Sequence, residues 1–202
     1  EAPGVQQTSV VGAAVETFDS LTAGPLGVYN SPIGTYSSGG QIVVGNAYGG
    51  SNQSLYVAVG AQSDTVEMTL TFATLKAYFG FYWPAGDALN RLDFYQGNVL
   101  LATFSVGDII GGLPAEYFGN PNTGVNETEP YVFLNFTSSD LNSRFDRVVF
   151  RNISTITGFE SDNHSTFDDI PDDPEVPEPS TYAMMASGLA GLIFFARRRA
   201  SR

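Results

Sequence analysis

The 202-residue chain contains no cysteine and a single histidine, His164. The missing thiols exclude disulfides, thiolate catalysis and cysteine metal ligands. One histidine without a Gly-x-Ser-x-Gly nucleophile elbow disfavours serine-hydrolase chemistry, and no glycine-rich stretch has the lysine of a phosphate-binding loop. Carboxylate pairs suited to glycoside hydrolysis are numerous, but no pair stands out. We therefore expect no enzymatic activity.

Basic residues are also scarce, with nine Lys and Arg against 21 Asp and Glu and a net charge of −12. Every acidic residue precedes position 182, and only five cations oppose them there: Lys76, Arg91, Arg144, Arg147 and Arg151. A body this acidic repels nucleic acid and anionic lipid, which excludes nucleic acid as a partner. It suits divalent cations and keeps an exported protein in solution.

Charge is missing altogether from the apolar run of residues 182–196, which is followed by Arg197-Arg198-Arg199. The run is shorter than the roughly 20 residues of a comfortable membrane span, but Ser180 and Thr181 extend it and the arginines can snorkel. We expect a single transmembrane helix within residues 182–202, with the arginines on the cytoplasmic side of the cytoplasmic membrane. The alternative, a buried C-terminal helix, rarely ends in three consecutive arginines.

The segment before this run is rich in proline and acidic residues. Both features favour an extended, solvated chain, so residues 171–181 are predicted to be a linker. The predicted organisation is thus an ectodomain over residues 1–170, a linker over 171–181 and a membrane segment with an arginine-rich end over 182–202.

Pro177-Glu178-Pro179, the apolar run and the terminal arginines together resemble the PEP-CTERM sorting signal of Gram-negative bacteria. In that family the signal is read by an exosortase, a membrane protease thought to cut near the motif. The resemblance implies that Pro177, Glu178 and Pro179 are the recognition element. It also implies export to the cell surface or extracellular space, with transient anchoring in the inner membrane. Because the signal requires export, we expect that a signal peptide preceded Glu1.

The dominant period of the body is two residues. Met68, Leu70 and Phe72 alternate with polar neighbours, as in a strand buried on one side. Gln96-Gly97-Asn98 is a tight hairpin signal between two further strands. The complete set of predicted strands covers residues 10–18, 41–46, 55–60, 66–72, 77–83, 91–95, 99–105, 131–136, 147–151 and 155–160. With no long helical period before the tail, the body is predicted to be an all-β, jelly-roll-like β-sandwich.

Two stretches of the body also resemble known ectodomains. Phe79-Gly80-Phe81-Tyr82-Trp83 and Phe145-Asp146-Arg147-Val148-Val149-Phe150 are similar to the sandwich domains commonly joined to PEP-CTERM signals. Those domains are usually described as exosortase-dependent surface proteins of unknown function. This resemblance therefore implies a location and leaves the activity open.

A calcium site is the first candidate for chemistry. Glu160 and Asp162 lie two positions apart, on one side of a strand, and Asn163 follows them. Hard oxygen ligands suit calcium, and Glu16 or Asp19 from a neighbouring first strand could complete the shell. The alternative is an acidic sheet edge whose carboxylates contact only water and loop backbone.

A carbohydrate site is the second candidate. The aromatic residues between positions 78 and 95 could include a platform for sugar rings, and Tyr82 and Trp83 are the best placed of them. Asp87 and Asn90 follow closely and could bind sugar hydroxyls. Because alternation sends only half of these aromatic side chains to each side, the remainder are expected to form core.

These features favour an exported surface or extracellular-matrix protein with a structural or adhesive role, associated with the exopolysaccharide of a biofilm. Two alternatives remain open. One is a calcium-dependent carbohydrate-binding module, and the other is a self-assembling subunit of a surface layer or filament.

Overall fold

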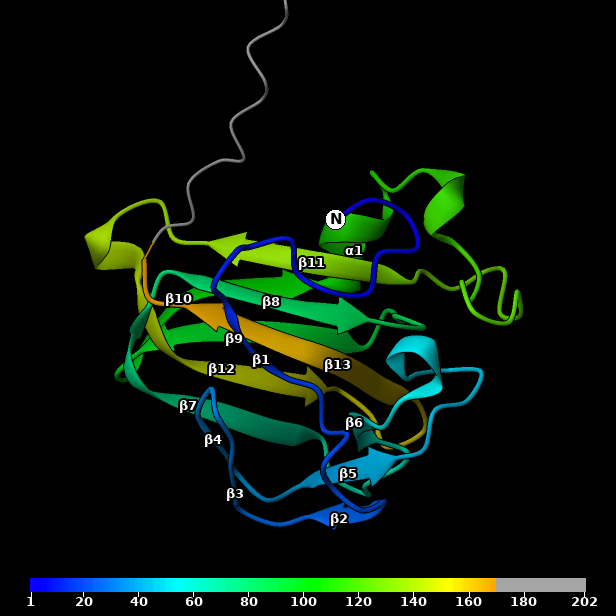
Figure 1. The fold of residues 1–202 in the computed structure, drawn as a ribbon, viewed down its shortest axis with the longest axis horizontal. Helices are drawn as coiled ribbons and strands as arrows, with labels where there is room; N and C mark the ends of the chain where they lie inside the picture. Colours follow the sequence, from blue (N-terminus) through cyan, green and yellow to red (C-terminus); the bar gives the residue numbers. More distant parts are fainter. Residues whose placement is uncertain (170–202) are drawn as a thin grey trace, which may run out of the picture. The chain divides into compact units, whose positions relative to one another are not determined.

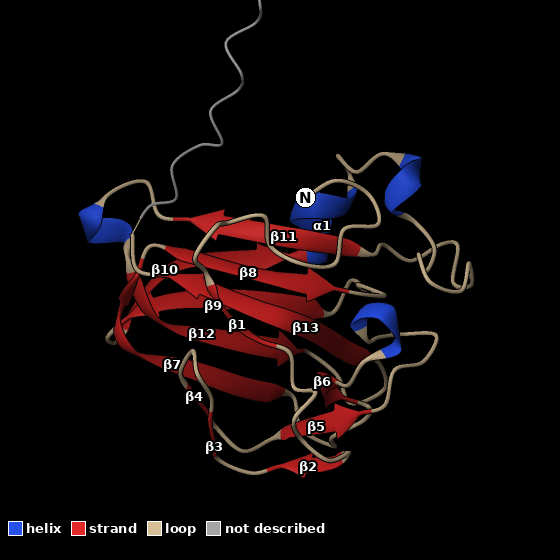
Figure 2. Ribbon diagram, in the orientation of Figure 1, coloured by secondary structure: helices blue, strands red, loops and turns tan. Residues whose placement is uncertain are grey.

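The computed structural model describes residues 1–169, which form two antiparallel β-sheets packed face to face (Figures 1 and 2). Every strand pairing between the named strands is antiparallel. The predicted all-β sandwich is thereby confirmed. The linker of residues 171–181, the transmembrane segment of 182–202 and the motif residues Pro177, Glu178 and Pro179 lie outside the described residues.

The first sheet has seven strands. In spatial order they are β11 (Val132–Thr137), β8 (Tyr78–Trp83), β13 (Gly158–Phe167), β6 (Tyr56–Gly60), β5 (Gly40–Val43) and β2 (Gly24–Leu26), with β1 (Ala14–Glu16) paired to β13. Glu16 is the register partner of His164, so the first and last strands are neighbours, as the sequence led us to expect.

The second sheet has six strands. In spatial order they are β10 (Val99–Ser105), β9 (Asn90–Gln96), β12 (Phe145–Asn152), β7 (Glu67–Lys76), β4 (Thr35–Tyr36) and β3 (Tyr29–Asn30). The predicted Gln96-Gly97-Asn98 hairpin joins β9 to β10, and Gly97 adopts φ +55°, a conformation that glycine reaches without strain.

Helices are short in the described residues. They are α1 (Val106–Ile110) and three 3-10 turns, η1 (Ser51–Gln53), η2 (Ala115–Tyr117) and η3 (Leu141–Ser143). Ser105 and Asp108 form a capping box at the start of α1. Five residues are too few to show a helical period, so α1 was not predicted. No helix within residues 1–169 is long and apolar enough to cross a membrane.

Aromatic rings from both sheets fill the core. Phe81 of β8 lies 6.0 Å from Phe150 of β12 and 6.1 Å from Phe159 of β13, measured between ring centroids. His164 is fully buried among these rings and stacks on Phe150 at 4.8 Å. Burial lowers the pKa of His164 to about 3, because a charged imidazole would lose its hydration there.

The predicted strand positions hold for most of the longer strands, and the last strand is the clearest exception. β13 continues to Phe167, seven residues beyond its predicted end. The alternation is interrupted by a register shift between Asp162 and Ser165, where Asn163 has φ +50°. A bulge of this kind hides the period of two from sequence analysis. The short strands β2, β3 and β4 were also not predicted.

Candidate functional site

The outer face of the seven-stranded sheet is covered by the chain itself. We call it the covered face. The N-terminal segment (residues 1–13) crosses β8 and β13 (Figure 1). The Nε2 of Gln6 donates to the Tyr82 hydroxyl at 3.1 Å, and Thr8 and Tyr78 share a 2.6 Å hydrogen bond between their hydroxyls. The Nδ2 of Asn163 donates to the Gln6 carbonyl at 2.7 Å. These contacts leave little of the covered face open to a ligand.

The residues of the predicted carbohydrate site are buried in the folded protein. Trp83 is 2% exposed and packs on Phe159 inside the core, while its Nε1 donates to Oδ1 of Asn90. Tyr82 is 1% exposed. A sugar needs an open aromatic face, so the prediction that Trp83 and Tyr82 form a stacking platform is wrong. Asn90 is also buried, and the Asp87 carboxylate accepts a hydrogen bond from the Leu89 amide within its own turn.

The carboxylates of the predicted calcium site are likewise engaged by protein groups. Asp162 accepts hydrogen bonds from the Ser51 amide at 2.7 Å and the Ser54 hydroxyl at 3.1 Å. Glu160 accepts from the Gln62 amide group. Burial raises the pKa of both Glu160 and Asp162 to about 7, because charge is poorly solvated at these positions.

The remaining predicted ligands serve separate structural contacts. Glu16 accepts from the Phe18 amide and the Tyr29 hydroxyl, and Asp19 accepts from the Leu55 amide. Within residues 1–169, no three acidic or histidine side chains are grouped closely enough to hold a metal ion. The structure therefore does not gather Glu16, Asp19, Glu160 and Asp162 into one ligand shell.

The outer face of the six-stranded sheet, by contrast, is lined by polar side chains. We call it the open face. On β7, β9 and β12 these side chains alternate with buried core residues such as Leu70, Phe94 and Val148. Six side chains of the open face are exposed, Asp93 and Val149 are buried, and the others are half-buried. The exposed side chains are Asn30, Thr35, Glu67, Thr71, Leu100 and Thr103, and the rest of the open face consists of Thr69, Arg91, Asp93, Tyr95, Ser105, Arg147, Val149 and Arg151.

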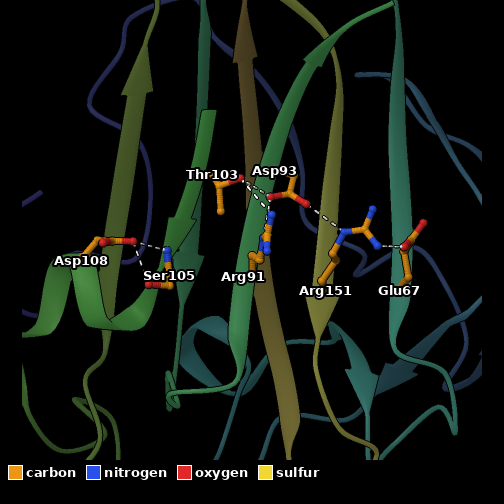
Figure 3. A network of polar contacts seen from close by, with 7 residues as sticks. All are labelled: Glu67, Arg91, Asp93, Thr103, Ser105, Asp108 and Arg151. Carbon is orange, nitrogen blue, oxygen red and sulfur yellow. Dashed lines mark hydrogen bonds and ion pairs between the residues drawn. The ribbon is translucent and has the colours of Figure 1, made fainter. Parts of the chain in front are cut away.

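An ionic network holds the centre of this face (Figure 3). The Asp93 side chain, 1% exposed, accepts from Nε of Arg91 and Nε of Arg151, each at 2.8 Å, and from the Thr103 hydroxyl at 2.7 Å. Arg151 also pairs with Glu67. Burial alone would raise the pKa of Asp93, but these three hydrogen bonds outweigh it and lower the pKa.

Arg147 is held differently from the other cations. Its guanidinium carbon lies 4.4 Å from the centroid of the Tyr95 ring, a cation–π contact, and its Nη2 donates to the Gly97 carbonyl at 2.9 Å. Lys76, Arg91, Arg144 and Arg151 all form ion pairs with carboxylates. Within the described residues Arg147 forms none, and its Nε has no hydrogen-bond partner.

Arg147 belongs to a row of polar side chains that crosses five strands. Successive register partners connect Tyr95 to Arg147, Arg147 to Thr71, Thr71 to Thr35 and Thr35 to Asn30. Neighbouring strands lie about 4.8 Å apart, so the row extends over roughly 19 Å. Such a row offers hydrogen-bonding groups at a regular spacing to an extended ligand.

Tyr95 is among the aromatic residues predicted to offer a sugar platform, but the rest of the open face was not predicted. A signal was available. Arg91-Leu92-Asp93-Phe94-Tyr95 alternates charged or aromatic residues with core residues, and Arg147-Val148-Val149-Phe150-Arg151 has an arginine at each end, four positions apart and therefore on the same side of a strand. The pairing of these two strands, which only the structure reveals, brings their polar sides together.

Fold and site together define an all-β sandwich protein with one covered and one open sheet face. The chain carries a PEP-CTERM protein-sorting motif, whose family model matches residues 175–199. The motif is the signal that exosortase recognises, so it indicates exosortase-dependent export to the cell surface. The predicted resemblance and the exosortase partner are thereby supported.

Comparisons with other proteins give little further information about the function of the ectodomain. No curated protein matches the chain. Among solved structures, the K2 cleaved adhesin domain of Lys-gingipain is similar with a TM-score of 0.46 and 12% identity, covering 77% of this chain and 99% of that chain. The exo-beta-1,3-galactanase of Phanerochaete chrysosporium follows with a TM-score of 0.36 and 10% identity, covering 73% of this chain and 30% of that chain. Similarities this low carry no argument about function.

Proposed function

We propose that this protein is an adhesive or structural component of the cell surface or extracellular matrix, associated with the exopolysaccharide of a biofilm. The sorting motif supports the location. The observation that carries the binding role is the open face, where hydroxyl and guanidinium groups are accessible on adjacent strands. Rows of polar groups on adjacent strands suit an extended polymer whose hydroxyls need many hydrogen-bond partners.

The covered face supports the same assignment by exclusion. Its aromatic and acidic side chains are buried beneath the N-terminal segment and hydrogen-bonded to it or to neighbouring loops. A polymer would have to displace these contacts before it could bind there. The open face requires no such rearrangement.

The test is retention of the purified full-length chain on exopolysaccharide from the producing organism. Thr71→Glu places a charged, larger side chain on the open face, and Thr137→Glu makes the same change at an exposed position of β11 in the other sheet. We expect the unaltered chain and Thr137→Glu to be retained and Thr71→Glu to be lost. Equal retention of the two variants would contradict binding through the open face.

The same experiment in the presence of a chelator addresses calcium. The proposed contacts are direct hydrogen bonds, so retention is expected to be unchanged when calcium is removed. Complete loss on chelation would favour the alternative, a calcium-dependent carbohydrate-binding module. Failure of the unaltered chain to bind under either condition would refute association with exopolysaccharide.

A further inference from the structure

Arg147 is an unusual cation for so acidic a protein. Residues 1–169 contain seventeen carboxylate side chains and only five cationic ones, yet Arg147 pairs with none of those carboxylates in the described structure. Its position is nevertheless restrained, by the Tyr95 ring on one side and the Gly97 carbonyl on the other. The carboxylate closest in sequence, Asp146, accepts instead from the Gly97 amide at 3.0 Å. Arg147 is thus held in place without an ion-pair partner in the described structure, and its guanidinium can pair with an acidic group of a ligand.

The residues around Arg147 indicate which class of ligand the site would bind. In a site for neutral sugars the Tyr95 ring would be free to stack on a sugar face, but here the guanidinium of Arg147 lies over it. A planar guanidinium recognises carboxylate, sulfate or phosphate oxygens through paired, charge-assisted hydrogen bonds. Thr71 and Thr35 continue the same row with exposed hydroxyls.

We infer that the row Tyr95–Arg147–Thr71–Thr35–Asn30 is a binding site for an anionic polysaccharide, in which Arg147 pairs with an acidic group of the polymer and the hydroxyls bind its neutral sugar hydroxyls. This inference rests on the proposed function and specifies the ligand class. Successive strands present one group each, about 4.8 Å apart, so an extended polymer that lies across the strands can contact several of them at once.

The charge of the rest of the molecule restricts how such a polymer binds. The acidic body repels a polyanion at long range, whereas the contact with Arg147 acts at short range. Salt shortens the reach of charge to about 8 Å at physiological ionic strength. Binding should therefore be at least as strong in physiological salt as in low salt. If binding depended on long-range attraction between opposite charges, added salt would weaken it.

Arg147→Gln, Arg147→Lys and Arg144→Gln are the variants to compare. Arg144 pairs with Asp169 and is not part of the row, so Arg144→Gln is a control that changes the net charge as Arg147→Gln does. Binding of each full-length chain to polygalacturonate, a polymer of acidic sugars, is compared with binding to neutral dextran and to vesicles containing anionic lipid. The unfolding midpoint of each variant shows whether the fold is retained.

We expect polygalacturonate to bind the unaltered chain and Arg144→Gln, with a roughly ten-fold weaker affinity for Arg147→Gln, the effect of losing one charge-assisted contact. Arg147→Lys should bind polygalacturonate more tightly than Arg147→Gln does, because lysine keeps the positive charge. Equal binding to dextran, an unaltered affinity in Arg147→Gln, or preference for anionic vesicles would each overturn the inference. If the organism's own exopolysaccharide still binds in those cases, the proposed function stands; if nothing binds, both fail.

Discussion

Tyr82 and Tyr95 both lie on outer faces of the sandwich, but their surroundings differ completely. Tyr82 is 1% exposed and bonded to Gln6 of the N-terminal segment, whereas Tyr95 is half-buried under the guanidinium of Arg147. The carboxylates follow the same division. Burial raises the pKa of Glu160 and Asp162 on the covered face, whereas hydrogen bonds from Thr103, Arg91 and Arg151 lower the pKa of Asp93 on the open face despite its burial. Residue type alone therefore does not report which face can meet a ligand.

The most disruptive test of this contrast is truncation of the two tyrosines. Tyr82→Ala should lower the free energy of unfolding by about 3 to 5 kcal/mol, as for other large buried aromatic residues, because it empties a site beneath the N-terminal segment. Tyr95→Ala removes mainly the contact with Arg147 and should cost roughly 1 kcal/mol. Urea unfolding monitored by circular dichroism measures both. Similar losses for the two variants would show that the faces are equally buried.

A smaller effect is expected from the pH dependence of the covered face. The pKa of Glu160 rises on folding from 4.5 to about 7, so its contribution favours the folded state below pH 4.5 and is lost as pH rises to about 7. Glu160→Gln should abolish this loss. Relative to the unaltered chain, the variant should gain about 3 kcal/mol of stability between pH 4 and pH 8.

Comparing the two proteins at each pH removes the contribution of His164, which has the opposite sign. Its pKa falls from 6.5 to about 3 on folding, so stability declines as pH drops below 6.5 in both proteins alike. A stability difference between the two that stays constant from pH 4 to pH 8 would argue against a buried, hard-to-ionise Glu160.

The smallest effect should come from the ionic network of the open face. Asp93→Asn removes the charge shared by Arg91 and Arg151, both of which retain substantial contact with water. We expect a loss of about 1 kcal/mol at pH 7, since water screens the exposed arginines. The loss should vanish at a pH low enough to protonate Asp93 in the unaltered chain. No difference at pH 7 would mean that the network contributes nothing to stability.

Much of this architecture could be predicted from the sequence, because alternation is a local property. β10 occupies the predicted residues 99–105, and β6, β8, β9 and β11 differ by only a residue or so at their ends. β13 was cut short because the bulge near Asn163 breaks its alternation. β3 and β4 have two residues each, too few for any period to appear.

The candidate site was harder to predict, since it depends on contacts between distant parts of the chain. Trp83 and Tyr82 have the composition of a sugar platform, but nothing local shows that Phe159 and Gln6 cover them. The role of Arg147 likewise depends on its strand pairing with Tyr95 and Thr71. The sorting motif could be recognised because its parts follow one another in the sequence.

The most direct measurement is methyl NMR of threonine-labelled protein during titration with the organism's exopolysaccharide. Thr35, Thr69, Thr71 and Thr103 lie on the open face, while Thr8 and Thr137 lie on the outer side of the other sheet, next to Tyr78. We expect the signals of the first group to shift with ligand and those of the second to remain in place. Shifts confined to Thr8 and Thr137 would contradict this expectation and place binding on the covered face.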